Sequence, residues 1–212
     1  MVDLAAGTGR LTAQLAKRCP HLVAVEPVAE MRAHIRDAQA VVGTAEQLPL
    51  ADDSAQAVFV AEAFHWFDYP TALGEIARVL RPGGGLAVMW NKAIEDDEQK
   101  RLRAALRDIV APHIYHPKGK DQFTRDPRDE RDWQTGRGWE MFEPLEYRAF
   151  FHERDTTRAD VVGLIGSWSF IGALDEPTRA DVLRRVEQLL AESGVEKYVQ
   201  RWRCDLYLTR RR

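Results

Sequence analysis

The segment Asp3-Leu4-Ala5-Ala6-Gly7-Thr8-Gly9, followed by Glu26, decides how this chain folds. Met1–Ala5 has the composition of the end of a buried strand, Ala6–Gly9 is a glycine-rich turn, and Leu11 begins the apolar stripe of a helix. Glycine suits such a turn because the backbone can approach a ligand with no Cβ in the way. An acid that ends the next strand can accept hydrogen bonds from both hydroxyls of a ribose. The pattern therefore predicts a nucleotide-cofactor site with Glu26 as the ribose acceptor.

Strand and helix patterns alternate outward from this turn. Short apolar segments typical of strands lie at His21–Val25, Ala40–Val42, Ala57–Ala61 and Leu86–Trp90. Apolar residues at helical spacing follow Pro27 and recur over Tyr69–Leu80 and Leu102–Val110. Arg81-Pro82-Gly83-Gly84-Gly85 is a strong breaker that should end the second of these helices. This alternation predicts an α/β fold with a parallel sheet covered by helices on both faces.

The second half of the chain begins differently. Tyr115–Glu143 contains prolines, glycines and charges of both signs, which fits a solvated surface; the alternative is a lid whose Trp133 and Trp139 shape a pocket. Regular patterns then return as a strand at Leu145–His152, helices at Val161–Ile171 and Pro177–Ser193, and an alternating strand at Tyr198–Leu208. Arg210–Arg212 should be a frayed, solvated tail.

These patterns predict a single domain over residues 1–212. We expect a cofactor-binding core at 1–113, a lid-like insertion at 114–143, and C-terminal strands and helices at 144–212 that complete the sheet. The net charge of −3 gives no bias toward nucleic acid or an anionic membrane. No apolar run approaches the ~20 residues that span a bilayer. Two distant cysteines, Cys19 and Cys204, indicate reduced thiols and a cytoplasmic protein.

Two ligand classes use a glycine-rich turn of this kind. A dinucleotide site has the pattern G-x-G-x-x-G, in which the third glycine allows close helix packing. Here Gly7-Thr8-Gly9-Arg10-Leu11-Thr12 lacks that third glycine, which disfavours a nicotinamide cofactor and an oxidoreductase. A turn that binds no ligand is the other alternative, and Glu26 argues against it because it stands where a ribose acceptor belongs.

Val2–Thr12 resembles the first motif of class I S-adenosylmethionine (SAM)-dependent methyltransferases, in which an acidic residue precedes a G-x-G-x-G turn. Asp3 matches the acidic position, and Gly7 and Gly9 match the last two glycines. Ala5 departs from the first glycine, so its methyl group stands where the family has none. The match therefore includes both the acid and most of the turn.

Further motifs of this family follow in order. Glu26 matches the ribose-binding acid, and Gly43–Pro49 resembles the third-strand motif, whose residues flank the adenine. Ala57–Phe67 resembles the fourth-strand motif, and Leu80–Gly84 resembles the turn before strand five. Together with the first motif they extend the resemblance to Trp90. Beyond it the likeness is looser and points to a bacterial small-molecule branch similar to type 11 methyltransferases.

The resemblance implies a fold and a set of site residues. The fold is a doubly wound, Rossmann-like sheet of seven strands in the order 3-2-1-4-5-7-6, with strand 7 antiparallel. The cofactor is SAM, and no metal is implied. The cofactor-binding residues that the resemblance carries over are Asp3, Ala5, Gly7, Gly9, Glu26, Ala45, Glu46 and Ala61.

His65 follows the fourth strand, on the side where a methyl acceptor should lie. Two interpretations stay open: His65 acts as a general base, or His65 and Trp66 pack the start of the next helix and wall the pocket. No Asn/Asp-Pro-Pro-Tyr/Phe sequence follows that strand, which disfavours methylation of nucleic-acid bases. We therefore expect transfer to a small-molecule acceptor, with no nucleic-acid or membrane partner.

The family has a further segment ahead of the first strand, including helix that covers SAM. We expect these N-terminal helices to be missing here, because the first strand begins at Met1. Their loss would favour weak SAM binding, slower turnover, instability or association, for example as a homodimer. The alternative function is then a catalytically impaired relic or a SAM-binding interaction module.

Overall fold

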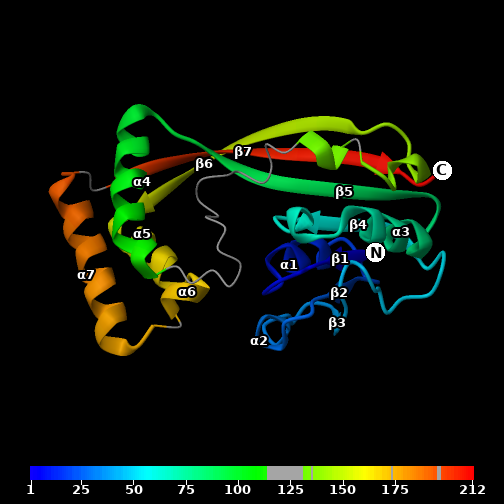
Figure 1. Cartoon of the computed structure of the whole chain (residues 1–212), viewed down its shortest axis with the longest axis horizontal. Helices are drawn as coiled ribbons and strands as arrows, with labels where there is room; N and C mark the ends of the chain where they lie inside the picture. The colour runs from blue at the N-terminus through cyan, green and yellow to red at the C-terminus, as the bar shows by residue number, and fades with distance from the viewer. Residues whose placement is uncertain (114–130, 135, 173, 195–196) are drawn as a thin grey trace. The chain divides into compact units, whose positions relative to one another are not determined.

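The computed structural model describes residues 1–113, 131–134, 136–172, 174–194 and 197–212. Its strands form a seven-stranded sheet in the order β3-β2-β1-β4-β5-β7-β6 (Figure 1), which confirms the predicted fold class and order. The strands are β1 (Val2–Leu4), β2 (Val23–Val25), β3 (Gln39–Val41), β4 (Ala55–Ala61), β5 (Leu80–Ile94), β6 (Glu146–Thr157) and β7 (Lys197–Arg210). The α-helices are α1 (Arg10–Ala16), α2 (Ala29–Arg32), α3 (Tyr69–Val79), α4 (Asp97–Val110), α5 (Arg158–Gly166), α6 (Ser169–Gly172) and α7 (Glu176–Glu192).

The chain divides into two compact units. The first contains Met1–Asn91, the described part of Arg125–Phe150, and Cys204–Arg212. The second contains the described parts of Lys92–Thr124 and Phe151–Arg203. The division expected at residues 113 and 143 stays a prediction. Residues 114–130 and 135 of the expected insertion lie outside the described residues.

The parallel part of the sheet forms the centre of the first unit. β1 pairs in parallel with both β2 and β4, β2 with β3, and β4 with β5. Leu4, Val25, Val58 and Val60 are fully buried, as expected for strands covered on both faces. α3 starts after Asp68 with Pro70 in its first turn and buries Leu73 and Ile76 against this core.

β7 runs antiparallel to β5. The Arg211 N–H donates to the Gly84 carbonyl at 2.9 Å, and the Gly83 N–H donates to the Arg211 carbonyl at 2.9 Å. Trp90, later in β5, contacts Tyr207, earlier in β7, at 5.9 Å between ring centroids. The expected frayed tail at Arg210–Arg212 is therefore wrong. Its backbone pairs with residues after α3, and the Arg211 side chain also donates to Asp53 and to the Leu80 carbonyl.

The Arg81–Gly85 breaker follows the end of α3 as predicted, and it also forms the first part of β5, where a register shift against β4 and a φ of 76° at Gly83 accommodate it. Two expected helices need correction. The helix expected over Val161–Ile171 is two helices, α5 and α6, which break at Ser167–Trp168. The helix expected after Pro27 is only the short α2.

The second unit has a helical core of its own. α4 and α5 each begin with a capping box, formed by Asp96 with Gln99 and by Thr157 with Asp160. Both helices pack against α7, whose N-cap is Asp175. The buried residues at this core are Val110, Val161, Ile165, Ile171, Val182, Val186 and Leu190. These three helices, labelled α4, α5 and α7 in Figure 1, thus bury apolar side chains against one another.

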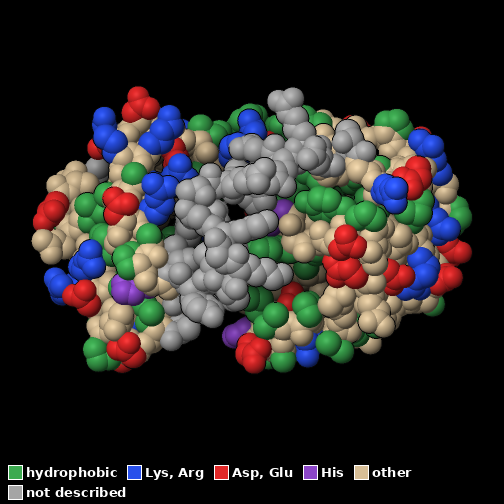
Figure 2. Space-filling model, viewed as in Figure 1, with side chains coloured by type: hydrophobic (Ala, Val, Ile, Leu, Met, Phe, Trp, Pro, Cys, Tyr) green, Lys and Arg blue, Asp and Glu red, His purple; other side chains and the backbone are tan. Residues whose placement is uncertain are grey.

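The surface carries mixed charge. Figure 2 shows Lys and Arg side chains interspersed with Asp and Glu side chains on the visible face. Within the described residues, no helix has both the length and the apolar character needed to cross a membrane.

Candidate cofactor site

The register of the parallel strands brings the predicted site residues to one edge of the sheet. Leu4 is aligned with Val25 on one side and with Val60 on the other. The residues that follow these strands therefore share the carboxyl edge of the sheet. β2 and β3 lie on one side of β1, and β4 and β5 on the other. The turn after β1 thus stands at the switch point of the sheet, where α/β folds bind ligands.

Glu26 joins the glycine-rich turn to the end of β2. The Gly7 N–H donates to Glu26 Oε2 at 2.8 Å, and the Val28 N–H donates to Glu26 Oε1 at 2.9 Å. The residue is only 4% exposed. A buried carboxylate needs such donors, because burying it without partners costs several kcal/mol. The structure therefore brings together two of the predicted residues that are far apart in sequence.

The turn itself needs left-handed backbone at three positions. Ala5, Gly7 and Gly9 have φ values of 55°, 58° and 83°. A Cβ added at Gly9 would lie 3.1 Å from Ile35 Cγ1, whereas one added at Gly7 would meet no atom within 4 Å. Ala5 occupies the position where the related family has glycine, and its positive φ explains that preference.

Asp3 is a buried acid beside this turn. It is 1% exposed, and Thr12 Oγ1 donates to its Oδ2 at 2.5 Å. Burial raises the pKa of Asp3 from 3.8 to about 6; the hydrogen bonds from Thr12 oppose the rise, and the charge of Glu26 adds to it. The end of β1 thus carries a carboxyl group that ionises only at a cost.

The loop after β3 carries the residues expected to flank an adenine. Ala45 is buried in the core, and Glu46 is half-buried. Glu46 Oε1 accepts from the Asp68 N–H at 3.0 Å, at the start of α3. The loop is therefore attached to a helix that the sequence does not place near it.

Ala61 ends β4 on the same edge and is aligned with Met89 of β5. The next residue, Glu62, was not singled out from the sequence. Its φ is 57°, and its Oε1 accepts from the backbone N–H and the Nδ2 group of Asn91, the latter at 3.2 Å. A non-glycine residue in this conformation is uncommon and occurs preferentially at functional sites. No sequence pattern indicates such a φ value at a glutamate.

His65 lies in the turn η1 (Phe64–Trp66) beyond β4. The buried Trp90 Nε1–H donates to His65 Nδ1 at 3.3 Å. Because an indole N–H can only donate, the neutral imidazole must carry its proton on Nε2. The ring nitrogen that faces Trp90 is therefore occupied, and the other one is a donor. This geometry favours a packing and orienting role over that of a general base.

An aromatic cluster stands behind His65. Phe64 is fully buried, and its ring lies 5.5 Å from Trp133 and 6.0 Å from Trp139. Trp133 is itself 1% exposed and contacts Trp90 at 5.1 Å. Trp133 is therefore part of the core of the first unit, and the alternative of a lid that shapes a pocket stays a prediction.

Among the described residues, no group of three or more His, Cys, Asp or Glu side chains could hold a metal. A pocket of about 420 Å³ lies at the amino ends of β1–β4 and is lined by His21, Asp37 and Ser54, among others. It stands at the edge opposite to Glu26, so it is not the cofactor site.

Comparison with known proteins identifies the family. A family model described as a methyltransferase domain matches residues 2–88. An uncharacterized methyltransferase of Mycobacterium tuberculosis is 36% identical over 195 residues, which make up 90% of this chain and 73% of the relative. An uncharacterized methyltransferase-like protein of Schizosaccharomyces pombe is 30% identical over 200 residues, or 89% of this chain and 72% of the relative.

A solved structure shows the same fold. The protein, from Anaeromyxobacter dehalogenans, is proposed to be a type II methyltransferase, and it is 21% identical with a TM-score of 0.66. The match covers 100% of this chain and 88% of that one. The chain belongs to the class I SAM-dependent methyltransferase family. Its fold, sheet order and first motif are those that the sequence predicts.

We predict that Ala5→Gly does not weaken the protein and stabilises it by up to about 1.6 kcal/mol. Glycine removes about 1–2 kcal/mol of left-handed strain, and the greater freedom of its unfolded chain offsets about 0.4–1 kcal/mol of that gain. Ala33→Gly is the control, because Ala33 has a φ of −61°. The Ala33→Gly variant should therefore be less stable than the wild type. Urea unfolding measures both free energies, and an equal loss in the two variants would contradict the prediction.

Asp3→Asn should change how stability depends on pH. Because the folded-state pKa of about 6 exceeds 3.8, the stability that Asp3 contributes is present below pH ~4 and is lost as pH rises through ~6. The difference corresponds to roughly 3 kcal/mol at pH 8. Asparagine keeps an acceptor for Thr12, so the variant should gain on the wild type between pH 4 and 8.

Thermal and urea unfolding at pH 4 and at pH 8 test this effect of Asp3. Asp108→Asn, at an exposed position of α4, controls for the change in net charge. A constant stability difference between the Asp3→Asn variant and the wild type from pH 4 to pH 8 would contradict the assignment.

The His65 tautomer can be observed directly. We predict that nitrogen-detected NMR at pH 8 finds the imidazole proton on Nε2, because Trp90 donates to Nδ1. Trp90→Phe removes that donor and should reduce the bias between the two tautomers. A proton found on Nδ1 in the wild type would rule out the hydrogen bond and restore His65 Nε2 as a candidate base.

Proposed function

We propose that this chain transfers the methyl group of SAM to a small-molecule acceptor, with the cofactor held at the carboxyl ends of β1 and β2. The observation that carries the proposal is the hydrogen bond from the Gly7 N–H to Glu26, 2.8 Å long. It places the glycine-rich turn beside the acid that the family uses for the ribose. Membership of a methyltransferase family supplies the reaction class.

The chemistry of this edge fits SAM. Each oxygen of Glu26 accepts one backbone N–H and has further lone pairs for ribose hydroxyls. The space beside Gly7 is open where a Cβ would stand, so a ligand can approach the backbone closely. Asp3 supplies a buried carboxyl group, whose ionised form suits a ligand with sulfonium and ammonium charges.

When bound, SAM supplies a methyl group on a sulfonium, which leaves readily as a neutral thioether. The chain therefore has mainly to bind, orient and exclude water. Glu26 fixes the ribose end, and the loop with Ala45 and Glu46 borders the adenine. Ala61 and Glu62, at the end of β4, border the acceptor side. A nucleophile must then be held roughly 3–3.5 Å from the methyl carbon.

His65 orients the acceptor in this proposal and does not deprotonate it. With Nδ1 accepting from Trp90, the neutral ring carries its proton on Nε2, which makes that atom a hydrogen-bond donor. A hydrogen-bond donor suits a methyl acceptor that is already negatively charged, such as a carboxylate, since it has no proton to lose and needs no base. The proposal therefore favours anionic small molecules over neutral hydroxyl compounds.

Calorimetry with S-adenosylhomocysteine tests the cofactor site. We expect the wild type to bind and Glu26→Ala to bind about tenfold more weakly or worse, a loss of ~1.4 kcal/mol that matches one charge-assisted hydrogen bond. Glu187→Ala, at an exposed position of α7, should bind as the wild type does. Undiminished binding by Glu26→Ala would overturn its assignment. The protein is then incubated with SAM and candidate carboxylic acids, and mass spectrometry looks for the methylated acid. If the protein binds SAM but no methylated product forms, an interaction module fits better.

A further inference from the structure

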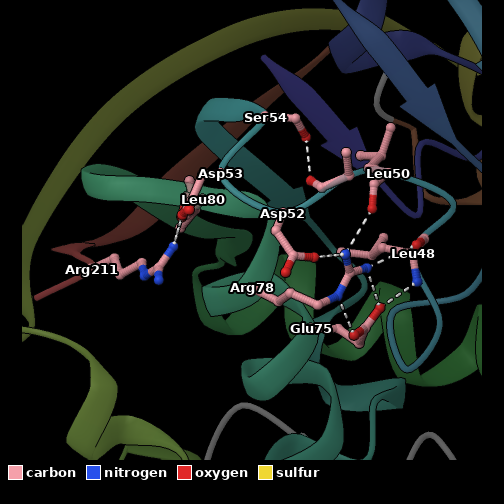
Figure 3. A network of polar contacts seen from close by, with 10 residues as sticks. Leu48, Leu50, Asp52, Asp53, Ser54, Glu75, Arg78, Leu80 and Arg211 are labelled. Atoms are coloured by element: carbon pink, nitrogen blue, oxygen red, sulfur yellow. Dashed lines mark hydrogen bonds and ion pairs between the residues drawn. The ribbon is translucent and has the colours of Figure 1, made fainter.

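Arg78 of α3 uses all of its donors on one loop and one neighbouring acid (Figure 3). Its Nε and Nη2 donate to the two oxygens of Glu75 at 2.7 and 2.8 Å. Its Nη1 donates to the Leu50 carbonyl at 2.8 Å and to Asp52 at 2.7 Å, and its Nη2 also donates to the Leu48 carbonyl at 3.0 Å. A guanidinium has five N–H groups, and each of them has a partner here.

The loop to which Arg78 donates, Leu48 to Asp52, has little regular structure of its own. Leu48 is held through both of its backbone polar groups, because its N–H donates to Glu75 Oε2 at 2.8 Å while its carbonyl accepts from Arg78. Its side chain is buried. Glu75 and Arg78 therefore act as one unit, and the hydrogen bond from Arg78 lowers the pKa of Glu75 below its ordinary value. Both residues come from one helix, at i and i+3.

The same loop begins with the residues that border the adenine in the proposed function. Ala45 and Glu46 lie three and two residues before Leu48, and Glu46 accepts a hydrogen bond from the N–H of Asp68, the N-cap of α3. α3 thus holds the loop at both ends, at Asp68 and at Arg78. The helix is anchored by its fully buried Leu73 and Ile76, so it provides a fixed frame for the loop.

The exposure of each partner indicates which contacts of Arg78 stabilise the loop. The Arg78 and Glu75 side chains are 31% and 22% exposed, whereas Asp52 is 73% exposed. An ion pair with a partner as exposed as Asp52 contributes little, because solvent screens it. The contacts that hold the loop are therefore the two carbonyls and the bidentate pair with Glu75. A lysine at this position would keep the charge but could not make this set of bonds.

We propose that Arg78 is a positioning residue for the cofactor: it holds the loop from Ala45 to Asp52 in its binding shape before the ligand arrives. This inference rests on the proposed function, because it assumes that the adenosine of SAM lies against Ala45 and Glu46. A loop that is already ordered loses less conformational freedom on binding, so the affinity is higher. Arg78 acts through the loop and does not touch the reacting atoms.

The test compares Arg78→Lys with a matched control, Arg184→Lys, whose arginine is 64% exposed on α7. S-adenosylhomocysteine is the probe, and calorimetry gives both the affinity and the fraction of molecules able to bind. We expect Arg78→Lys to bind about tenfold more weakly with unchanged stoichiometry, and Arg184→Lys to bind within twofold of the wild type. Hydrogen exchange should show faster exchange of the Leu48 amide in the ligand-free Arg78→Lys variant.

The outcomes separate the two proposals. If the wild type binds and Arg78→Lys binds equally well, the positioning role is overturned while the proposed function stands. If Arg78→Lys lowers only the stoichiometry and the melting temperature, Arg78 is merely structural, and the inference is again overturned. If the wild type itself binds neither SAM nor S-adenosylhomocysteine, the proposed function fails. Weaker affinity at full stoichiometry, together with faster exchange at Leu48, supports the inference.

Discussion

The hydrogen bond between the Gly7 N–H and the Glu26 carboxylate is the interaction on which the site depends. Glu26 is buried, so its charge requires N–H donors, and these come from backbone groups. For the Gly7 N–H to point at Glu26, the chain must turn through left-handed conformations at Ala5, Gly7 and Gly9. The start of α1 at Arg10 then follows. A single buried charge thus constrains the turn, the helix start and the spacing between β1 and β2.

Features with a local cause could be predicted from the sequence. Alternating apolar strands and amphipathic helices gave the α/β class, and the motif order gave the sheet order, which the structure confirms. Asp175 caps α7 as its position before Pro177 predicts. Asp3 lies in the first strand and Glu26 directly follows the second, as the pattern predicts. Each of these follows from residues close together in the chain or from a spacing that the related family shares.

Features that depend on distant backbone could not be predicted. In the sequence Arg78 cannot be told from any other arginine of an exposed helix face. It binds the backbone carbonyls of Leu48 and Leu50, and every residue type has such a carbonyl. Trp133 lies among charged residues, yet it is buried against Phe64 and Trp90. A positive φ at a glutamate such as Glu62 has no signal either. In all three cases the deciding partner comes from another element, so tertiary packing overrides the local pattern.

The electrostatics of the site connect its stability with its proposed ligand. Asp3 lies in β1 and Glu26 directly follows the neighbouring strand β2, and the charge of Glu26 helps to raise the pKa of Asp3. Ionised Asp3 therefore destabilises the free protein at neutral pH. A cationic ligand reverses the sign of this contribution, because it interacts favourably with the charge that burial penalises. Binding such a ligand then both stabilises the fold and lowers the pKa of Asp3. In the proposed function the sulfonium of SAM supplies this positive charge, whereas the neutral thioether of its product does not.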